Sequence, residues 1–145
     1  LKDANSSEFD QKSKNAVIDF LPGQIKLKET GASMRLGNYP CVIKKGSKVY
    51  EHYKKEEIIE RHRHRYEVNN LFKERLEKEG LLPTGTSPDG NLVEIMEVAG
   101  HSFMVGSQFH PEFLSRPNRP HPLFNGFVSS VNETVVEGDQ IRLIQ

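Results

Sequence analysis

The sequence has almost no cysteine, no long apolar run and no signal peptide. Its 145 residues include a single cysteine, so an internal disulfide is excluded and a reducing compartment is favoured. The longest apolar runs contain only a few residues, far fewer than the roughly 20 that cross a bilayer. Residues 1–16 lack the charged and apolar regions of a secretory signal. We therefore expect a cytoplasmic protein with no membrane span.

The sequence also has no excess of charge of either sign. Twenty basic and twenty acidic side chains give a formal net charge of +0, so the overall field favours neither nucleic acid nor an anionic membrane as a partner. The chain contains no internal repeat and no low-complexity tract. Its length fits one domain with a substantial core.

Short apolar segments alternate with helical patterns along the chain. The apolar segments predict strands. They cover residues 16–21, 32–36, 42–43, 91–98 and 102–109. The clearest helical pattern is "LFKERLEKE", which Asn69 or Asn70 can cap and Gly80 can end. Further helical turns are predicted up to Tyr53 and from Pro122 onward. Strands that alternate with helices predict a layered α/β fold.

The segment "EIIERHRHRYEVN" is predicted to be extended, with arginines on one face. Alternation puts Arg61, Arg63, Arg65 and Glu67 together on that face. Guanidinium groups bind carboxylates or phosphates through two parallel hydrogen bonds, so the face suits a small anionic ligand. Solvated arginines on an edge strand are the alternative interpretation.

Histidines occupy the opposite face of the same segment. His62 and His64 point the same way, and with His110 they are the best candidates for a zinc site. No cysteine partner and no HExxH helix accompanies them. The sequence therefore predicts no metal.

The segment "VGSQFHPEF" places a histidine and a carboxylate at the end of a predicted strand. Open α/β sheets carry reactive groups beyond the carboxyl ends of their strands. Pro111 favours extended backbone at His110, so His110 and Glu112 should point the same way, and the carboxylate can fix one imidazole tautomer. This pattern is typical of a catalytic base and its orienting acid. The alternative is a histidine and an exposed glutamate without chemistry, because the motif supplies no nucleophile.

The only cysteine is Cys41, which follows Pro40 and begins "CVIKKG". A cysteine nucleophile on an α/β sheet usually occupies a sharp strand-to-helix turn flanked by glycines. Cys41 has no such neighbours. We expect it to be a small buried residue of a strand.

Five segments carry a family resemblance. They are "ANSSEF", "MRLGNYPC", "ERHRHRYEVNN", "GTSPDGNLVEIMEV" and "QFHPEFLSRPNRPHPLFNGF", within residues 1 to about 127. In this order they resemble the C-terminal glutamine amidotransferase domain of the CTP synthase family. "QFHPEF" is typical of class I amidotransferases in general, whereas "RHRHRYE" and "MRLG" resemble the CTP synthase family in particular. It implies a three-layer, flavodoxin-like α/β fold of which residues 1–145 are the C-terminal portion, with the synthetase domain absent.

The resemblance also implies an activity and site residues. Family members hydrolyse glutamine through a Cys-His-Glu triad and pass the ammonia to a synthetase domain, which aminates UTP to CTP at the expense of ATP. By resemblance, His110 is the triad base and Glu112 its orienting acid, while Glu8 and Arg65 bind glutamine. A glutamate and an arginine suit the ammonium and carboxylate of a free amino acid.

The same resemblance implies partners. They are L-glutamine, the synthetase domain of the same chain, and further copies in a homo-oligomer, a tetramer, when the protein is full-length. No cofactor is expected in residues 1–145, since ATP and Mg²⁺ belong to the synthetase domain. The family's nucleophile precedes "ANSSEF". We therefore expect residues 1–145 alone to be inactive and to fold poorly, because an apolar face would stay uncovered.

Two other functions remain open from the sequence. One is a class I amidotransferase whose ammonia acceptor differs from UTP. The other is a binding or regulatory module without catalysis, in which the arginine face binds an anion.

Overall fold

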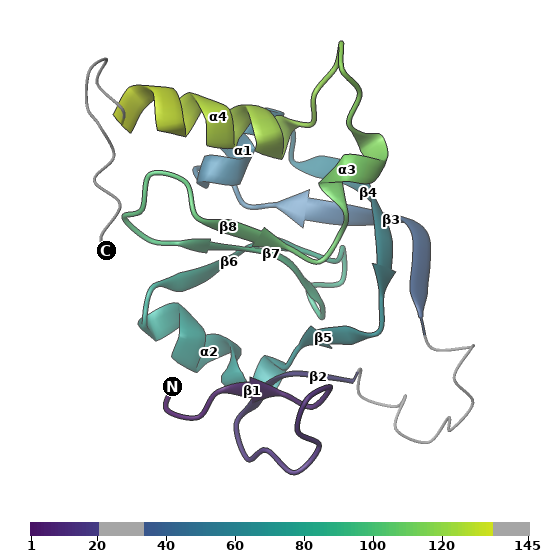
Figure 1. The fold of residues 1–145 in the computed structure, drawn as a ribbon, viewed down its shortest axis with the longest axis vertical. Helices are drawn as coiled ribbons and strands as arrows, with labels where there is room; N and C mark the ends of the chain where they lie inside the picture. Colours follow the sequence, from purple (N-terminus) through teal and green to yellow (C-terminus); the bar gives the residue numbers. More distant parts are fainter. Residues whose placement is uncertain (21–33, 135–145) are drawn as a thin grey trace, which may run out of the picture.

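A five-stranded antiparallel sheet forms the centre of the protein (Figure 1). The computed structural model describes residues 1–20 and 34–134. The strand order of this larger sheet is β4-β3-β6-β7-β8, and each neighbouring pair is antiparallel. Its strands are β3 (Arg35–Ile43), β4 (Glu57–His64), β6 (Leu81–Thr86), β7 (Val93–Val98) and β8 (Val105–Ser107).

A smaller sheet contains β1 (Asn5–Ser6), β2 (Ala16–Phe20) and β5 (Tyr66–Val68). β1 and β2 are parallel, and β2 and β5 are antiparallel. The backbone bends at Arg65, between β4 and β5, so the "RHRHRYE" segment passes from the larger sheet to the smaller one.

This bend corrects the predicted pattern of faces. Arg61 and Arg63 are exposed on β4 as predicted. Glu67 is not on their face, because it follows the bend and is only 3% exposed. The predicted grouping of Glu67 with the arginines is therefore wrong.

Four helices complete the described part of the chain. They are α1 (Lys48–Tyr53), α2 (Asn70–Lys78), α3 (Pro111–Leu114) and α4 (Pro122–Thr134). In Figure 1, α1 and α4 lie on one side of the larger sheet, and α2 and the smaller sheet lie on the other. Within residues 1–20 and 34–134, no helix is long and apolar enough to cross a membrane.

The predicted helix after "RHRHRYEV" is confirmed in detail. α2 starts at Asn70, and the Asn69 side chain accepts a hydrogen bond from the Leu71 backbone N–H at 3.1 Å. Gly80 has a φ of 87°, a left-handed conformation that favours glycine after a helix end. The predicted α/β class is confirmed by this arrangement of helices and sheets.

The core lies between the larger sheet and the layer of α1 and α4. Its buried members come from strands, from helices and from the segment before α3. They are Cys41, Ile43, Val49, Ile58, Ile95, Phe109 and Leu123. Phe109 directly precedes His110, so the candidate catalytic segment is attached to the core at its first residue.

Gly85 allows β6 to pack closely against this core. A Cβ atom at Gly85 would lie 2.7 Å from Ile95 Cγ1 and 2.9 Å from Cys41 Sγ.

We expect Gly85→Ala to lower the free energy of unfolding by about 1–3 kcal/mol through overpacking. The melting temperature of the purified full-length protein measures the effect. The matched control is Gly106→Ala on β8, where an added Cβ has nothing within 4 Å. Equal melting temperatures for the two variants would contradict this packing.

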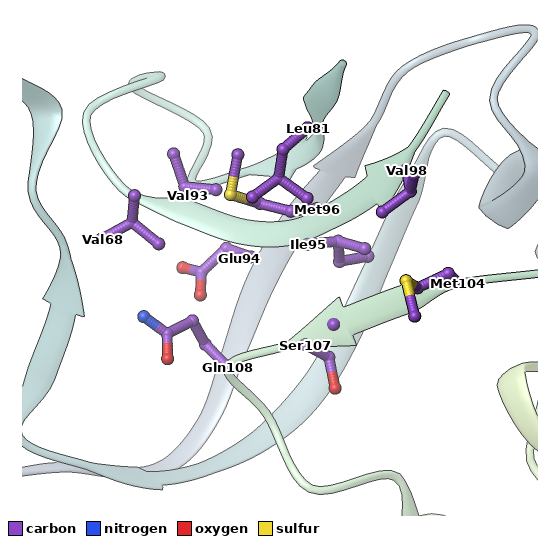
Figure 2. A pocket seen from close by; sticks show the side chains of 11 residues that line it. Val68, Leu81, Val93, Glu94, Ile95, Met96, Val98, Met104, Ser107 and Gln108 are labelled. Carbon is purple, nitrogen blue, oxygen red and sulfur yellow. The ribbon is translucent and has the colours of Figure 1, made fainter. Parts of the chain in front are cut away.

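An apolar groove of about 300 Å³ crosses β7 and β8. Leu81, Met96, Val98 and Met104 line it, and Figure 2 shows Glu94 and Gln108 near one another among the lining side chains. Met104 is 55% exposed. The groove thus joins an open apolar surface to a buried carboxylate.

Candidate active site

His110 and Glu112 form a hydrogen-bonded pair. His110 Nδ1 lies 2.7 Å from Glu112 Oε1. His110 has extended backbone, with φ −106° and ψ 96°, as predicted from Pro111. Glu112 is not extended, since it lies in the first turn of α3. The predicted pairing is present, but it arises from the start of a helix and not from strand alternation.

Neighbouring elements fix the position of the His110 imidazole. The His110 backbone N–H donates to the Arg61 carbonyl oxygen on β4 at 2.9 Å. The Phe113 ring stacks on the imidazole, with 4.8 Å between ring centroids and 22° between planes. His62 and Phe109 form a bridge between β4 and the same segment. The histidine is therefore held by β4 on one side and by α3 on the other.

The pair has the electronic features of a base and its orienting acid. When Nδ1–H donates to the Glu112 carboxylate, the Nε2 atom keeps its lone pair and can accept a proton. The hydrogen bond from His110 lowers the pKa of Glu112, so the carboxylate stays ionised. The side chains are 37% and 56% exposed, which leaves the pair accessible to a reactant.

Arg65 and Glu8 lie at the edges of the smaller sheet. Arg65 is half-buried at the bend before β5, and its guanidinium forms no ion pair with any residue in ranges 1–20 and 34–134. Glu8 is exposed in the turn after β1, and its backbone N–H donates to Ser6 Oγ at 3.2 Å. Among the residues that the structure describes, neither side chain has an ion-pair partner that a ligand would have to displace. In the described ranges, no hydrogen bond joins either of them to His110 or Glu112.

A buried polar cluster lies between the two sheets. Arg35 Nη1 is 2.7 Å from Glu94 Oε1 and 3.5 Å from Glu67 Oε1. His62 Nδ1 is 2.8 Å from His64 Nε2. Burial raises the pKa of Glu67 to about 7 and lowers the pKa of His62 to about 3. The two histidines thus group with Glu94 rather than with His110, their predicted companion.

A second buried cluster ties α1 and the start of α4 to β4. Tyr53 Oη donates to Glu60 Oε1 at 2.8 Å, and His121 Nε2 lies 3.1 Å from the same oxygen. Burial raises the pKa of the Tyr53 hydroxyl. This cluster fixes β4 one residue before Arg61, whose carbonyl binds the His110 backbone.

Sequence reasoning missed both clusters. The visible signal of the first cluster is Glu94, a charged residue between apolar neighbours in "LVEIM". A carboxylate in such a place needs a partner within the fold. The partners Arg35 and His62 come from other strands, so their identity is not visible in local sequence.

Cys41 is a core residue, as predicted. It is fully buried and belongs to the hydrophobic core. Burial, followed by the nearby Glu94 and Glu60 charges, raises the pKa of its thiol to about 12. A thiol with so high a pKa has almost no thiolate at neutral pH, so Cys41 cannot serve as a nucleophile.

Cys41 is therefore expected to resist alkylation in the native protein. Iodoacetamide at mildly alkaline pH should leave it unmodified, whereas the same reagent should label it fully in denaturant, because alkylation requires the thiolate. Mass spectrometry of the peptide that contains Cys41 measures the modified fraction. Native labelling as fast as that of an unfolded cysteine would show that the thiol is exposed.

Comparison with known proteins identifies the family. Residues 15–130 match the class-I glutamine amidotransferase family. The chain belongs to that family. A CTP synthase of Dehalococcoides mccartyi is 55% identical over 140 residues, covering 97% of this chain and 26% of that protein. A CTP synthase of Rubrobacter xylanophilus is 57% identical over 130 residues, covering 90% of this chain and 23% of that protein.

A solved structure supports the same relationship. The amidotransferase chain superimposes on the glutaminase domain of Trypanosoma brucei CTPS, solved with bound acivicin, with a TM-score of 0.82 and 35% identity. The match covers 95% of this chain and 54% of that one. The predicted class I amidotransferase fold and the resemblance to the CTP synthase glutaminase domain are confirmed. The chain spans about a quarter of the length of the curated relatives it matches.

Proposed function

We propose that this class I amidotransferase chain is part of the glutaminase domain of a CTP synthase. In this role, it hydrolyses glutamine and supplies ammonia for the ATP-dependent amination of UTP to CTP. One observation carries the proposal. His110 and Glu112 share a 2.7 Å hydrogen bond on the fold of this family. Glutamine hydrolysis through a covalent intermediate needs such an oriented base.

His110 acts as the proton carrier in this mechanism. Its Nε2 atom takes the proton from a cysteine thiol, which then attacks the side-chain amide carbon of glutamine. The imidazolium returns the proton to the departing ammonia, and the neutral imidazole that results then activates water to release glutamate. Glu112 remains an ionised carboxylate that stabilises the imidazolium. Buried Cys41 is unsuited to be that nucleophile. In line with the family resemblance, we propose that a cysteine that precedes "ANSSEF" has this role.

Arg65 and Glu8 bind the amino-acid end of glutamine in the proposal. The Arg65 guanidinium pairs with the α-carboxylate, and the Glu8 carboxylate pairs with the α-ammonium. Both side chains lack an ion pair within the described ranges and can take these roles without breaking one. Arg65 and Glu8 thus belong to the smaller sheet and its turns, whereas the reacting pair lies at the start of α3.

The finer assignments follow from the relationship to CTP synthases. The synthetase domain of the same chain is the partner that receives ammonia, and ATP and Mg²⁺ act there. No step of glutamine hydrolysis passes through them. We further propose a cytoplasmic homotetramer. The single buried cysteine of the chain suits a reducing compartment.

Arg65→Ala tests the substrate-binding assignment in the full-length protein. A lost charge-assisted hydrogen-bond pair is worth about 1.5–3 kcal/mol, so we expect the KM for glutamine to rise roughly 10- to 100-fold. Synthesis supported by free ammonium should be unchanged, because it bypasses glutamine. Arg63→Ala on exposed β4 is the matched control. A KM equal to that of the control would remove Arg65 from the site.

The alternative amidotransferase function differs in its ammonia acceptor. The similarity to CTP synthases across nearly the whole chain favours UTP. A module without catalysis is disfavoured by the oriented His110–Glu112 pair. Glutamine-dependent ammonia release that responds to another acceptor and not to UTP would support the first alternative.

A further inference from the structure

The buried cluster of His62, His64 and Glu94 has the composition of a metal-binding site. One ligand atom from each residue lies within 4.8 Å of the others. His62 Nδ1 lies 2.8 Å from His64 Nε2 and 3.7 Å from Glu94 Oε2. The three residues come from β4 and β7, which are separated in the sheet by β3 and β6.

Several buried polar atoms of this cluster lack a hydrogen bond, although Glu67 Oε1 lies within ion-pair distance of Arg35 and His64. His62 Nε2, Glu94 Oε2 and Glu67 Oε1 are buried without a hydrogen bond to any described residue. The side chains of His62 and Glu94 are both fully buried. A buried carboxylate oxygen without a hydrogen bond destabilises the fold, because it has lost its water and gained no donor in return. The described residues therefore do not supply all the hydrogen-bond partners that this cluster needs.

The neighbours of the cluster orient its donor atoms. His64 Nδ1 donates to the Tyr66 carbonyl oxygen at 3.1 Å, which leaves the lone pair on Nε2, the atom facing His62. Arg35 Nη1 binds Glu94 Oε1 and leaves Oε2 free. Ligands of bound metals are usually fixed by such outer hydrogen bonds from a backbone carbonyl or a charged side chain.

The charge balance also allows a cation. Arg35 contributes one positive charge, and Glu67 and Glu94 contribute two negative charges when ionised. Two neutral imidazoles and a carboxylate form a donor set that suits Zn²⁺. The apolar groove of Figure 2 reaches Glu94 and offers a route for an ion to enter.

We propose that His62, His64 and Glu94 bind a divalent transition metal, with Zn²⁺ as the best match. Metal–nitrogen bonds of about 2.0–2.1 Å in tetrahedral geometry place two donors about 3.3 Å apart, so the histidines separate by roughly half an ångström on binding. His62 then carries its proton on Nε2. The three protein ligands leave a fourth coordination position for a water molecule. This inference does not depend on glutamine hydrolysis.

The metal would link strands next to the catalytic segment. His62 bridges to Phe109, the residue before His110. An ion bound by His62 and Glu94 therefore connects β4 to β7, and His62 is the residue of β4 that pairs with Phe109. Its role is structural, because no hydrogen bond or ion pair joins His62, His64 or Glu94 to His110 or Glu112 within the described residues.

Zinc binding by the full-length protein tests the proposal. The protein is freed of metal with a chelator, given excess Mg²⁺ to fill magnesium sites, and titrated with Zn²⁺ while bound zinc is measured by mass spectrometry. We expect one equivalent of Zn²⁺ and a higher thermal unfolding midpoint. Glu94→Gln keeps the side-chain shape and should reduce zinc affinity about 10- to 100-fold, as should His64→Ala. Exposed His101→Ala is the matched control.

Cobalt provides a readout that does not depend on folding of the variants. Co²⁺ bound by the unmodified protein through nitrogen and oxygen donors should give visible absorption bands, and Zn²⁺ should displace them. The same zinc stoichiometry and affinity in Glu94→Gln, His64→Ala and His101→Ala would overturn the proposal. So would the absence of both zinc uptake and cobalt bands in the unmodified protein.

Discussion

His110→Ala in the full-length protein is expected to lower kcat for glutamine hydrolysis about 10²- to 10⁴-fold, the range that a general acid–base contributes. The imidazole is the group that moves protons between the thiol, the leaving ammonia and water. Its removal leaves the thiol without an activating base. Ammonia release from glutamine under steady-state conditions measures the loss. Synthesis of CTP from added ammonium should remain, because that step does not use the triad.

Two variants sharpen this result. Glu112→Gln keeps the size of the side chain but removes the charge that stabilises the imidazolium, so we expect a loss in kcat smaller than that of His110→Ala. His101→Ala changes an exposed histidine in the turn between β7 and β8 and should leave the activity unaltered. Full glutaminase activity in His110→Ala would remove the base assignment.

Arg35→Ala is expected to destabilise β3 and β7 by about 3–5 kcal/mol. The guanidinium is the positive partner of Glu94 at 2.7 Å and lies 3.5 Å from Glu67. Removal of one partner from a buried ion pair leaves an uncompensated buried charge, which costs this much. Hydrogen exchange of the β3 and β7 amides in the full-length protein measures the local free energy of opening.

Arg63→Ala is the control for this effect. Arg63 is an exposed arginine on β4, and its removal should change the free energy of opening by less than about 0.5 kcal/mol. Should the two variants show equal protection of β3 and β7, the Arg35 ion pairs would contribute nothing measurable. The account of the buried cluster would then need revision.

Local sequence signals predicted the elements whose structure is determined locally. α2 was predictable because Asn69 and Gly80 mark its ends, and β7 because four of its six residues are apolar. β6 was missed, since "LLPTGT" contains a proline and a glycine that normally weaken a strand. Gly85 is required there for close packing against Ile95, a contact that the sequence around Gly85 does not reveal.

Long-range contacts explain the other differences. The bend at Arg65 carries the chain between sheets, and pairing of Phe20 with Tyr66 stabilises it, so alternation along "RHRHRYE" could not predict the burial of Glu67. Spacing on α4 predicts one apolar face through Leu123, Phe127 and Val131. Only Leu123 is buried, while Phe127 is 56% exposed.

The sequence could predict the His110–Glu112 pair of the candidate site, but not the residues that surround this pair. The His110–Glu112 contact depends on residues two apart and on Pro111, so the sequence contains most of the information. The contact of His110 with the Arg61 carbonyl depends on how the segment before α3 meets β4. The grouping of His62 and His64 with Glu94 likewise depends on the order of strands in the larger sheet.

Transfer of a nitrogen isotope tests the central claim most directly. The full-length protein is incubated with UTP, ATP, Mg²⁺ and glutamine labelled with ¹⁵N in its side-chain amide, and the nucleotide product is analysed by mass spectrometry. We predict CTP with the label in its amino group, and labelled CTP formed about 10²- to 10⁴-fold more slowly by His110→Ala under the same conditions. Equal labelling of CTP by the two proteins, or glutamine left intact by the unmodified protein, would contradict the account.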